Sequence, residues 1–220
     1  MAENPNSKTI IWDWNGTLLD DLDICIKGIN VYLKERDLNT LDNNRYREIF
    51  GFPIGDYYQK IGFDFKKDSL EDLSSKFIAT YFENFDQTKL SDGTREVLEK
   101  FQKEGYQQYI LSAMDQNSLE NSVKKFGITK YFKIIRGAQD KLAHGKIDYG
   151  EKLFTELKLN PESTCFIGDT THDKEIADSL NAHCVLFSGG HQSYERLATN
   201  NTIVVNELID SFGAVEKILK

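Results

Sequence analysis

The chain has 220 residues, of which 40% are hydrophobic and 28% are charged. These values suit one large globular domain, or one domain with a smaller insert, built around a sizeable core. The charged side chains comprise 27 basic and 35 acidic groups, so the net charge is −8. Because such a surface repels phosphate backbones and anionic lipids, we expect neither nucleic acid nor a membrane as a partner.

The cysteines and the amino-terminal residues indicate a cytoplasmic protein. Cys165 and Cys184 lie within apolar runs, and a total of three cysteines fits reduced core residues better than disulfides. The first eight residues are polar and lack the apolar stretch of a signal peptide. Apolar runs elsewhere in the chain are shorter than a transmembrane helix requires.

Short apolar runs, rich in β-branched and aromatic residues, alternate with segments of helical periodicity. Such runs are typical of buried parallel strands. We expect strands at residues 9–12, 108–111, 133–135, 164–167, 184–187 and 202–205. Helical patterns between them end before Gly105, Gly127 and Pro161, and Asp92 is the expected amino-terminal cap of the first. The alternation predicts an α/β protein with a Rossmann-like parallel sheet and right-handed crossovers.

A long insertion interrupts this alternation. Residues 13–107 separate the first two expected strands, whereas a single crossover needs only about a dozen residues. Apolar side chains recur at helical spacing in residues 22–36 and 69–85, with no strong strand pattern between the two segments. We therefore predict a discontinuous core domain, residues 1–21 and 88–220, and an α-helical cap domain, residues 22–87, over the carboxyl end of the first strand.

The strongest chemical signal directly follows the first expected strand. It is the segment Asp13-Trp-Asn-Gly-Thr-Leu-Leu-Asp20. Open α/β folds bind ligands at the carboxyl ends of their strands, so Asp13 would stand at a binding edge. Gly16 provides the backbone freedom that a tight turn needs there. A polar strand exit, which any α/β protein has, is the alternative interpretation.

A second acidic segment, Gly168-Asp-Thr-Thr-His-Asp173, also directly follows an expected strand. Asp169 and Asp173 are four residues apart and can face one site together with Asp13. Three carboxylates so close would repel one another and raise each other's pKa. A bound divalent cation would relieve this repulsion, and hard oxygen ligands suit Mg²⁺. Helix capping by either aspartate is the competing explanation.

Two further residues gain meaning from their order along the chain. Ser112 ends the second expected strand and Lys146 opens a helix; alone, the first reads as a cap and the second as a solvated side chain. Taken in order, Asp-x-Asn-Gly-Thr, Ser, Lys and Gly-Asp-x-x-x-Asp resemble the haloacid dehalogenase superfamily. Residues 50–53 and 190–192, together with the second acidic segment, resemble its phosphoglycolate-phosphatase-like branch, which has an inserted helical cap. The resemblance covers nearly the whole chain.

The resemblance implies a Mg²⁺-dependent hydrolase of a small phosphorylated metabolite that forms an aspartyl-phosphate on Asp13. The implied catalytic residues are Asp13, Asn15, Ser112 and Lys146. The implied phosphate-binding residues are Thr17, which would also position the nucleophile loop, Ser112, Ala113 through its amide, and Lys146. The implied metal ligands are Asp13, Asp169 and the backbone carbonyl of Asn15, with Asp173 either on the ion or one layer further out.

At Asn15 the chain departs from the superfamily pattern. Phosphatases of the superfamily carry an aspartate here, which protonates the leaving alkoxide and then helps to activate water. An amide can do neither, and such acid–base help is worth roughly 10²–10⁴-fold. The site then serves good leaving groups such as acyl or aryl phosphates, takes an acid from His172 or the cap, or binds phosphate without hydrolysing it well. A deliberate replacement of the natural residue is a fourth explanation.

Two alternative functions stay open at this point. Phosphonoacetaldehyde hydrolases of the superfamily have a small non-acidic residue at the position of Asn15 and a Schiff-base lysine in the cap, where this chain offers Lys27, Lys34 and Lys60. A weakly active phosphate-binding or regulatory protein is the other alternative. Arg45, Arg47 or Lys60 would meet a second anionic group of a substrate, although surface solvation is the simpler expectation for each. We expect a structural role for His172 and a monomer or homodimer.

Overall fold

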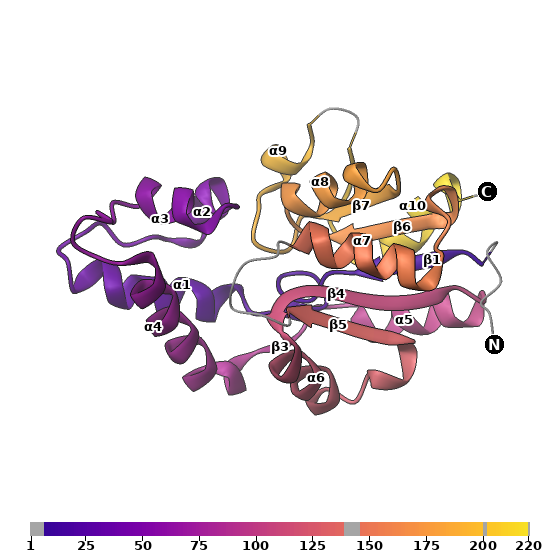
Figure 1. Cartoon of the computed structure of the whole chain (residues 1–220), viewed down its shortest axis with the longest axis horizontal. Coiled ribbons are helices and arrows are strands. Elements are labelled where there is room, and N and C mark those ends of the chain that lie inside the picture. Colours follow the sequence, from indigo (N-terminus) through magenta and orange to yellow (C-terminus); the bar gives the residue numbers. More distant parts are fainter. Residues whose placement is uncertain (1–6, 139–145, 200–201, 220) are drawn as a thin grey trace.

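The computed structural model describes residues 7–138, 146–199 and 202–219. A six-stranded parallel sheet with the order β5-β4-β1-β6-β7-β8 forms its centre (Figure 1). The strands are β1 (Thr9–Trp12), β4 (Gln107–Asp115), β5 (Ile134–Ala138), β6 (Thr164–Gly168), β7 (His183–Phe187) and β8 (Ile203–Val205). Each expected strand is present, and the predicted α/β fold with a Rossmann-like parallel sheet is confirmed.

The first strand of the chain, β1, lies in the middle of this sheet, between β4 and β6. Its Ile10 and Trp12 side chains pack on one face, against α5 (Thr94–Lys103), α6 (Gln116–Lys125) and α10 (Asp210–Ile218). Ile11 packs on the other face, against α7 (Lys146–Leu157) and α8 (Thr171–Ser179). Because helices cover both faces, apolar side chains are favoured at every position of β1.

The helices of the core end where the glycines and proline predicted, but one expected cap is wrong. Helices α5 and α6 stop just before Gly105 and Gly127, and α7 stops before Pro161. The amino-terminal cap of α5 is Gly93 rather than Asp92. The backbone φ angle at this cap is 80°, a left-handed conformation that favours glycine over aspartate.

Residues 22–83 form a helical layer beside the sheet (indigo to purple in Figure 1). Its helices are α1 (Leu22–Lys34), α2 (Asn43–Ile49), α3 (Ile54–Lys60) and α4 (Leu70–Glu83). They pack around a hydrophobic cluster of their own, which includes Leu33, Tyr57 and Leu73. This cluster agrees with the helical insert that we expect, while the domain boundaries at residues 21/22 and 87/88 stay a prediction.

Short elements connect the helical layer to the sheet. The chain enters the layer through β2 (Leu19–Asp20) and leaves it through a 3₁₀ turn (Phe85–Gln87) and β3 (Lys89–Leu90). Strands β2 and β3 pair in antiparallel fashion, so the two connections lie side by side. The remaining short elements are 3₁₀ turns at Thr129–Tyr131 and Pro161–Ser163 and the helix α9 (Tyr194–Leu197).

The three cysteines are free thiols, in agreement with the prediction of reduced residues. Within the described part of the chain, the helices are too short or too polar to span a membrane.

The core packing identifies Phe101 as one of the large aromatic side chains on which the fold depends. Phe101 is fully buried, with its ring 5.7 Å from Trp12 and 5.0 Å from both Tyr106 and Phe212. Phe101→Ala should lower the free energy of unfolding by about 3–5 kcal/mol, because the cavity it leaves cannot fully collapse. Urea unfolding followed by circular dichroism measures this. Ile78→Ala, on an exposed part of α4, is the control and should change stability by less than about 0.5 kcal/mol. Equal losses in both variants would contradict the central position of Phe101.

Candidate active site

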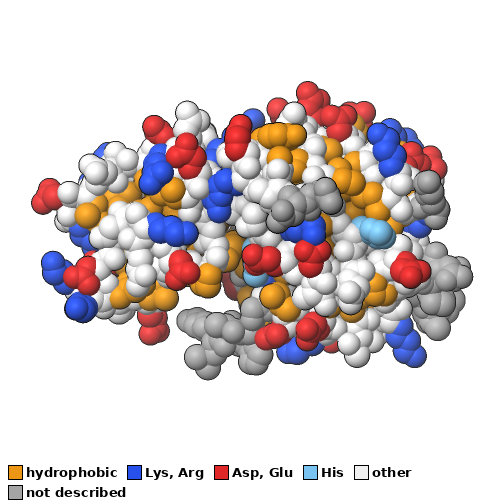
Figure 2. Space-filling view, turned by 90° about the horizontal axis from the view of Figure 1, so that it is seen from above, with side chains coloured by type: hydrophobic (Ala, Val, Ile, Leu, Met, Phe, Trp, Pro, Cys, Tyr) orange, Lys and Arg blue, Asp and Glu red, His pale blue; other side chains and the backbone are white. Residues whose placement is uncertain are grey.

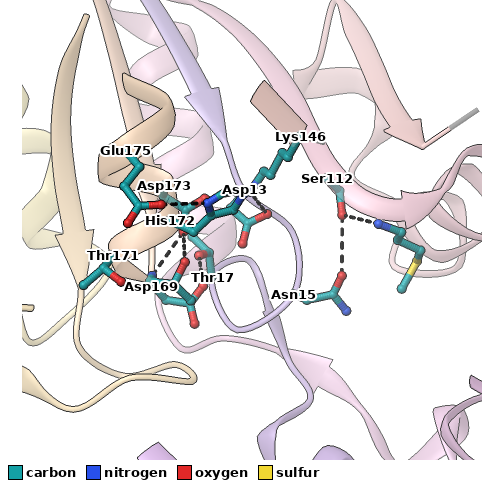
Figure 3. Close-up of polar contacts among 12 residues, drawn as sticks. Asp13, Asn15, Thr17, Ser112, Lys146, Asp169, Thr171, His172, Asp173 and Glu175 are labelled. Carbon is teal, nitrogen blue, oxygen red and sulfur yellow. Dashed lines mark hydrogen bonds and ion pairs between the residues drawn. The ribbon is translucent and has the colours of Figure 1, made fainter. Parts of the chain in front are cut away.

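Acidic side chains from separate segments meet at the carboxyl ends of β1 and β6 (Figure 3). Asp13 directly follows β1, and its backbone N–H donates to the Ile167 carbonyl of β6 at 2.9 Å. Asp169 directly follows β6, and Asp173 lies in the first turn of α8. One carboxylate oxygen from each of the three aspartates lies within 4.8 Å of those of the other two. Their convergence follows from the adjacency of β1 and β6, since parallel strands end at the same edge.

Asp173 serves both roles that the sequence left open. Its Oδ2 accepts hydrogen bonds from the backbone N–H and the hydroxyl of Thr170, as an amino-terminal helix cap does. Its Oδ1 faces the opposite way and accepts a hydrogen bond from Lys146 Nζ at 2.6 Å. The Asp173 carboxylate therefore caps the amino-terminal end of α8 and is also part of the acidic cluster.

Lys146 is a buried counter-charge rather than a solvated surface lysine. It opens α7, and its Nζ lies 2.6 Å from both Asp13 Oδ1 and Asp173 Oδ1. Its side chain is only 8% exposed. The ammonium group thereby links β1 to α8, and it holds the carboxylate of Asp13 from one side.

The loop after β1 has a shape that depends on glycine. Gly16 adopts a φ angle of 74°, and a Cβ atom there would lie 2.3 Å from Asp169 Oδ2. The hydroxyl of Thr17, fully buried, donates to Asp169 Oδ1 at 2.9 Å. This contact agrees with a loop-positioning role for Thr17, while its implied contact with phosphate stays a prediction.

Among the described residues, three carboxylates of the cluster face one ammonium group, so their charges do not balance. Burial, reinforced by the two neighbouring carboxylates and partly offset by Lys146, raises the pKa of Asp13 to about 8. Burial also raises the pKa of Asp169 to about 6. Burial opposes ionisation of Asp173 as well, but Lys146 outweighs it and the pKa of Asp173 is lowered. Burial would lower the pKa of Lys146, yet the adjacent Asp13 and Asp173 raise it.

This donor set fits a hard divalent cation. Each ligand atom is a carboxylate oxygen, which suits Mg²⁺ and not a thiolate-seeking metal. Thr17 and the backbone N–H of His191 donate to the two oxygens of Asp169, at 2.9 and 2.6 Å, and so fix the direction in which the carboxylate points. An added positive charge would also offset the burial and the carboxylate repulsion that together raise the pKa of Asp13.

Ser112 and Ala113 lie at the carboxyl end of β4, next to the loop after β1. The regular pairing of β4 with β5 is interrupted between Leu111 and Asp115, so residues 112–114 leave the regular ladder. Ser112 is buried, and its hydroxyl lies 3.5 Å from Asn15 Oδ1, at the limit of a hydrogen bond. Ala113 is exposed. The structure therefore brings the implied phosphate-binding residues of β4 to the same edge as Asp13 and Lys146 (Figure 3).

A buried polar network that the sequence did not reveal adjoins Asn15. The Asn15 Nδ2 amide donates to Asp21 Oδ2 at 2.7 Å and to the Tyr81 hydroxyl at 3.0 Å. Asp21 also accepts hydrogen bonds from Gly16 N at 2.9 Å and from the Tyr81 hydroxyl at 2.8 Å. The sequence shows Tyr81 only as part of an apolar stripe and Asp21 only as the neighbour of Asp20.

His191 completes this network as a buried cation. Its Nε2 lies 3.2 Å from Asp21 Oδ1, and its Nδ1 lies 3.1 Å from the Tyr46 hydroxyl. Burial disfavours the charged imidazole, but the carboxylate of Asp21 outweighs burial and raises the pKa of His191 to about 9. Burial likewise opposes ionisation of Asp21, and His191 with the hydrogen-bond donors lowers the pKa of Asp21.

Contacts from the segment that begins in α2 hold the helical layer against the core near the site. Gln192, fully buried, accepts a hydrogen bond from Thr171 N at 2.9 Å and donates to the Phe50 carbonyl at 3.0 Å. Arg47 donates to the carbonyl oxygens of Ser188 and Gln192. Residues 190–192 carry a signal in the sequence as part of the family resemblance, but their contact with residues 47–50 is visible only in the fold.

The other residues singled out in the sequence lie away from the acidic cluster or on the surface. His172 pairs with Glu175 at 3.1 Å, and its ring lies 5.0 Å from that of Phe52, which agrees with a structural role. Arg45 is exposed and pairs with Glu48, and Lys60 is exposed. On the face shown in Figure 2, basic and acidic side chains are interspersed rather than gathered into one large patch.

Comparison with known proteins agrees with this geometry. A protein of Caldanaerobacter subterraneus subsp. tengcongensis, provisionally named pyrophosphatase PpaX, is 26% identical over 180 residues, which are 80% of this chain and 79% of that protein. The tyrosine-protein kinase PtkA of Mycobacterium tuberculosis is 22% identical over 206 residues, 93% of this chain and 69% of the kinase. The structure of a predicted phosphoglycolate phosphatase from Haemophilus somnus 129PT superposes with a TM-score of 0.75 at 20% identity, covering 95% of this chain and 98% of that one.

Residues 10–187 match the family of haloacid dehalogenase-like hydrolases. This segment contains β1, the helical layer and the acidic cluster, and the resemblance that the sequence predicts is confirmed. The chain therefore belongs to the haloacid dehalogenase-like hydrolases, and the predicted enzyme class, a hydrolase, is confirmed.

Proposed function

We propose that the chain is a Mg²⁺-dependent phosphatase that acts on a small phosphorylated metabolite through an aspartyl-phosphate on Asp13. One observation supports this most directly. Asp13 stands at the end of the central strand, held by Lys146 at 2.6 Å and clustered with Asp169 and Asp173. Its side chain is 11% exposed, so part of that side chain is accessible from solvent. Relatives named for pyrophosphatase and phosphoglycolate phosphatase activity agree with a phosphoryl substrate.

The residues of this chain divide the reaction into two steps. In the first, a carboxylate oxygen of Asp13 attacks phosphorus, the bond to the leaving oxygen breaks, and that oxygen departs with the electron pair. In the second, water attacks the phosphorus of the aspartyl-phosphate, the bond from phosphorus to the Asp13 oxygen breaks with its electron pair on Asp13, and the proton lost by the water passes to solvent. Lys146, Ser112 and the Ala113 amide stabilise the negative charge of the phosphoryl oxygens in both steps.

Mg²⁺ would be held by the carboxylates of Asp13 and Asp169 and by the backbone carbonyl of Asn15. Asp173 would either coordinate the ion directly or contact it through another ligand. The bound ion supplies the positive charge that lets an anionic nucleophile approach an anionic phosphate. Thr17 and His191 keep the carboxylate of Asp169 in position for this role.

Asn15 points to substrates with good leaving groups. Its Nδ2 is occupied by Asp21 and Tyr81, and an amide supplies no proton to a departing oxygen at neutral pH. His172, the alternative acid, pairs with Glu175 on its own helix. We therefore propose acyl or aryl phosphates as substrates, and slow turnover of alkyl phosphates such as phosphoglycolate, whose alkoxide leaves poorly without a proton.

The alternative functions have less support. Lys27, Lys34 and Lys60 are exposed, so none of these three is placed as a Schiff-base lysine of a phosphonoacetaldehyde hydrolase would be. A phosphate-binding protein without turnover stays the alternative that experiment must separate. A small phosphorylated metabolite as the partner, a cytoplasmic location and a monomeric or homodimeric state also remain proposals.

Asp13→Asn should reduce Mg²⁺-dependent phosphate release from acetyl phosphate and p-nitrophenyl phosphate by at least about a thousandfold, because the nucleophile is lost. Asp23→Asn, an exposed carboxylate on α1, is the matched control and should keep full activity. A parent protein that releases phosphate from neither compound would identify a binding protein instead. Residual activity in the Asp13 variant above about a tenth of the parent would rule out Asp13 as the nucleophile.

Mg²⁺ affinity should rise with pH between about 6 and 8, the raised pKa values of Asp169 and Asp13. Below these values a carboxyl group holds a proton that the ion must displace, so affinity should change by roughly tenfold per pH unit for each proton released. Calorimetric titrations in buffers of different ionisation enthalpy count these protons. The count should approach zero above pH 8, where both groups are already ionised. An affinity that is constant across this range would contradict a site built on these two carboxylates.

A further inference from the structure

Asn15, Asp21 and Tyr81 form a closed triangle of hydrogen bonds at the junction of the sheet and the helical layer. Asn15 Nδ2 donates to Asp21 Oδ2 and to the Tyr81 hydroxyl, and that hydroxyl donates to the same Asp21 oxygen. Asn15 belongs to the nucleophile loop, Asp21 immediately precedes α1, and Tyr81 lies on α4. The triangle therefore joins the catalytic loop to two helices of the neighbouring layer.

We propose that Asp21 and Tyr81 are positioning residues that hold the Asn15 amide in one orientation and thereby link the catalytic loop to α4. This inference rests on the proposed phosphatase function and names two further residues on which that function depends. The triangle turns Nδ2 toward the helical layer and leaves Oδ1 beside the Ser112 hydroxyl. Asp21 and Tyr81 are 2% and 5% exposed, so water cannot replace these hydrogen bonds without a large penalty.

The charge of Asp21 explains why an amide, and not a carboxylate, occupies position 15. Five donors from the residues that the structure describes surround the Asp21 carboxylate: Asn15 Nδ2, Gly16 N, the Tyr81 hydroxyl, His191 Nε2 and, at 3.9 Å, the Cys25 thiol. A carboxylate at position 15 would replace the first donor by a second anion 2.7 Å away in a buried place. Like charges at that distance repel strongly, so positions 15 and 21 accommodate one carboxylate and one amide.

An exchange of the two residue types, which places the carboxylate at position 15 and the amide at position 21, satisfies the same hydrogen bonds. In Asn15→Asp/Asp21→Asn, the new amide oxygen at position 21 can accept from Gly16 N and His191. Its nitrogen can donate to the new carboxylate at position 15. The Tyr81 hydroxyl can then accept from the amide at position 21 and donate to that carboxylate. The exchange places a carboxylate where phosphatases of the family have their acid and removes the charge that opposes it.

Tyr81→Phe tests the positioning role, because it removes one hydroxyl and keeps the ring that packs on Phe82 and Phe85. We expect kcat for acetyl phosphate to fall about tenfold, the typical effect of a lost buried hydrogen bond to a charged group, while KM changes little. Tyr57→Phe is the matched control, since its buried hydroxyl in the same helical layer has no hydrogen-bond partner among the described residues. Equal kcat values in the two variants would overturn the proposal.

The exchange variant tests the pairing of charge. Asn15→Asp alone should unfold at a lower temperature than the parent and gain little on phosphoglycolate. Asn15→Asp/Asp21→Asn should recover the unfolding temperature and hydrolyse phosphoglycolate at least about a hundredfold faster than Asn15→Asp, the lower end of the range for acid–base help. If the double variant hydrolyses phosphoglycolate no faster than Asn15→Asp does, the proposed pairing of one carboxylate with one amide at positions 15 and 21 is overturned.

A measurement without turnover separates this inference from the proposed function. The side-chain amide protons of Asn15, identified by their loss in Asn15→Asp, should exchange slowly with water in nuclear magnetic resonance spectra. They should exchange faster in Tyr81→Phe and at the parent rate in Tyr57→Phe. Fast exchange in the parent overturns the positioning role alone, whereas a parent inactive on acetyl phosphate, with slow amide exchange, overturns the phosphatase function alone.

Discussion

Repulsion among three clustered carboxylates, only partly offset by Lys146, is the constraint on which the rest of the site depends. Asp13, Asp169 and Asp173 lie within reach of one ion, and Lys146 neutralises only part of their charge. Burial makes this imbalance costly, since the charges cannot be screened by water. A divalent cation would restore the balance, and an arriving phosphate would then meet a site of lower negative charge. The same electrostatic argument therefore supports both the proposed metal site and the proposed anionic substrate.

The second buried charge pair, Asp21 with His191, belongs to the connection between the sheet and the helical layer. It lies next to the first cluster, because the backbone N–H of His191 donates to Asp169 while its imidazole faces Asp21. Tyr46 and Tyr81 bring hydroxyl groups from the helical layer to this pair. Polar groups that are nine-tenths or more buried tolerate little displacement, so the position of the helical layer and the geometry of the nucleophile loop are tied together.

Asn15 lies between the acidic cluster and the Asp21–His191 pair, and its amide bears on the kind of phosphate that we propose as substrate. A carboxylate at this position would serve acid–base chemistry, but it would face Asp21 across a single hydrogen bond. The amide satisfies Asp21 and gives up proton transfer, and a leaving group that departs unaided removes the need for the acid in the first step of the reaction. The absence of an acid at position 15 thus follows from local electrostatics, and it supports the proposal that the chain acts on activated phosphates.

The sequence by itself determined the parallel sheet, the helical insert and the residues of the acidic cluster. Local patterns are sufficient for these: apolar runs identify buried strands, and an aspartate that directly follows such a run must stand at the carboxyl edge of the sheet. Asp13, Asp169 and Asp173 were therefore predictable, and Lys146 became so through its order along the chain. The tertiary structure alone decided that Asp21, Tyr81 and His191 meet beside Asn15, and that Gln192 joins Thr171 to Phe50. Tyr81 is 66 residues from Asn15 and His191 is 170 residues from Asp21, and no local pattern encodes a contact between buried polar groups so far apart. Such contacts arise when packing of the helical layer against the core removes water and forces each polar group to find a partner.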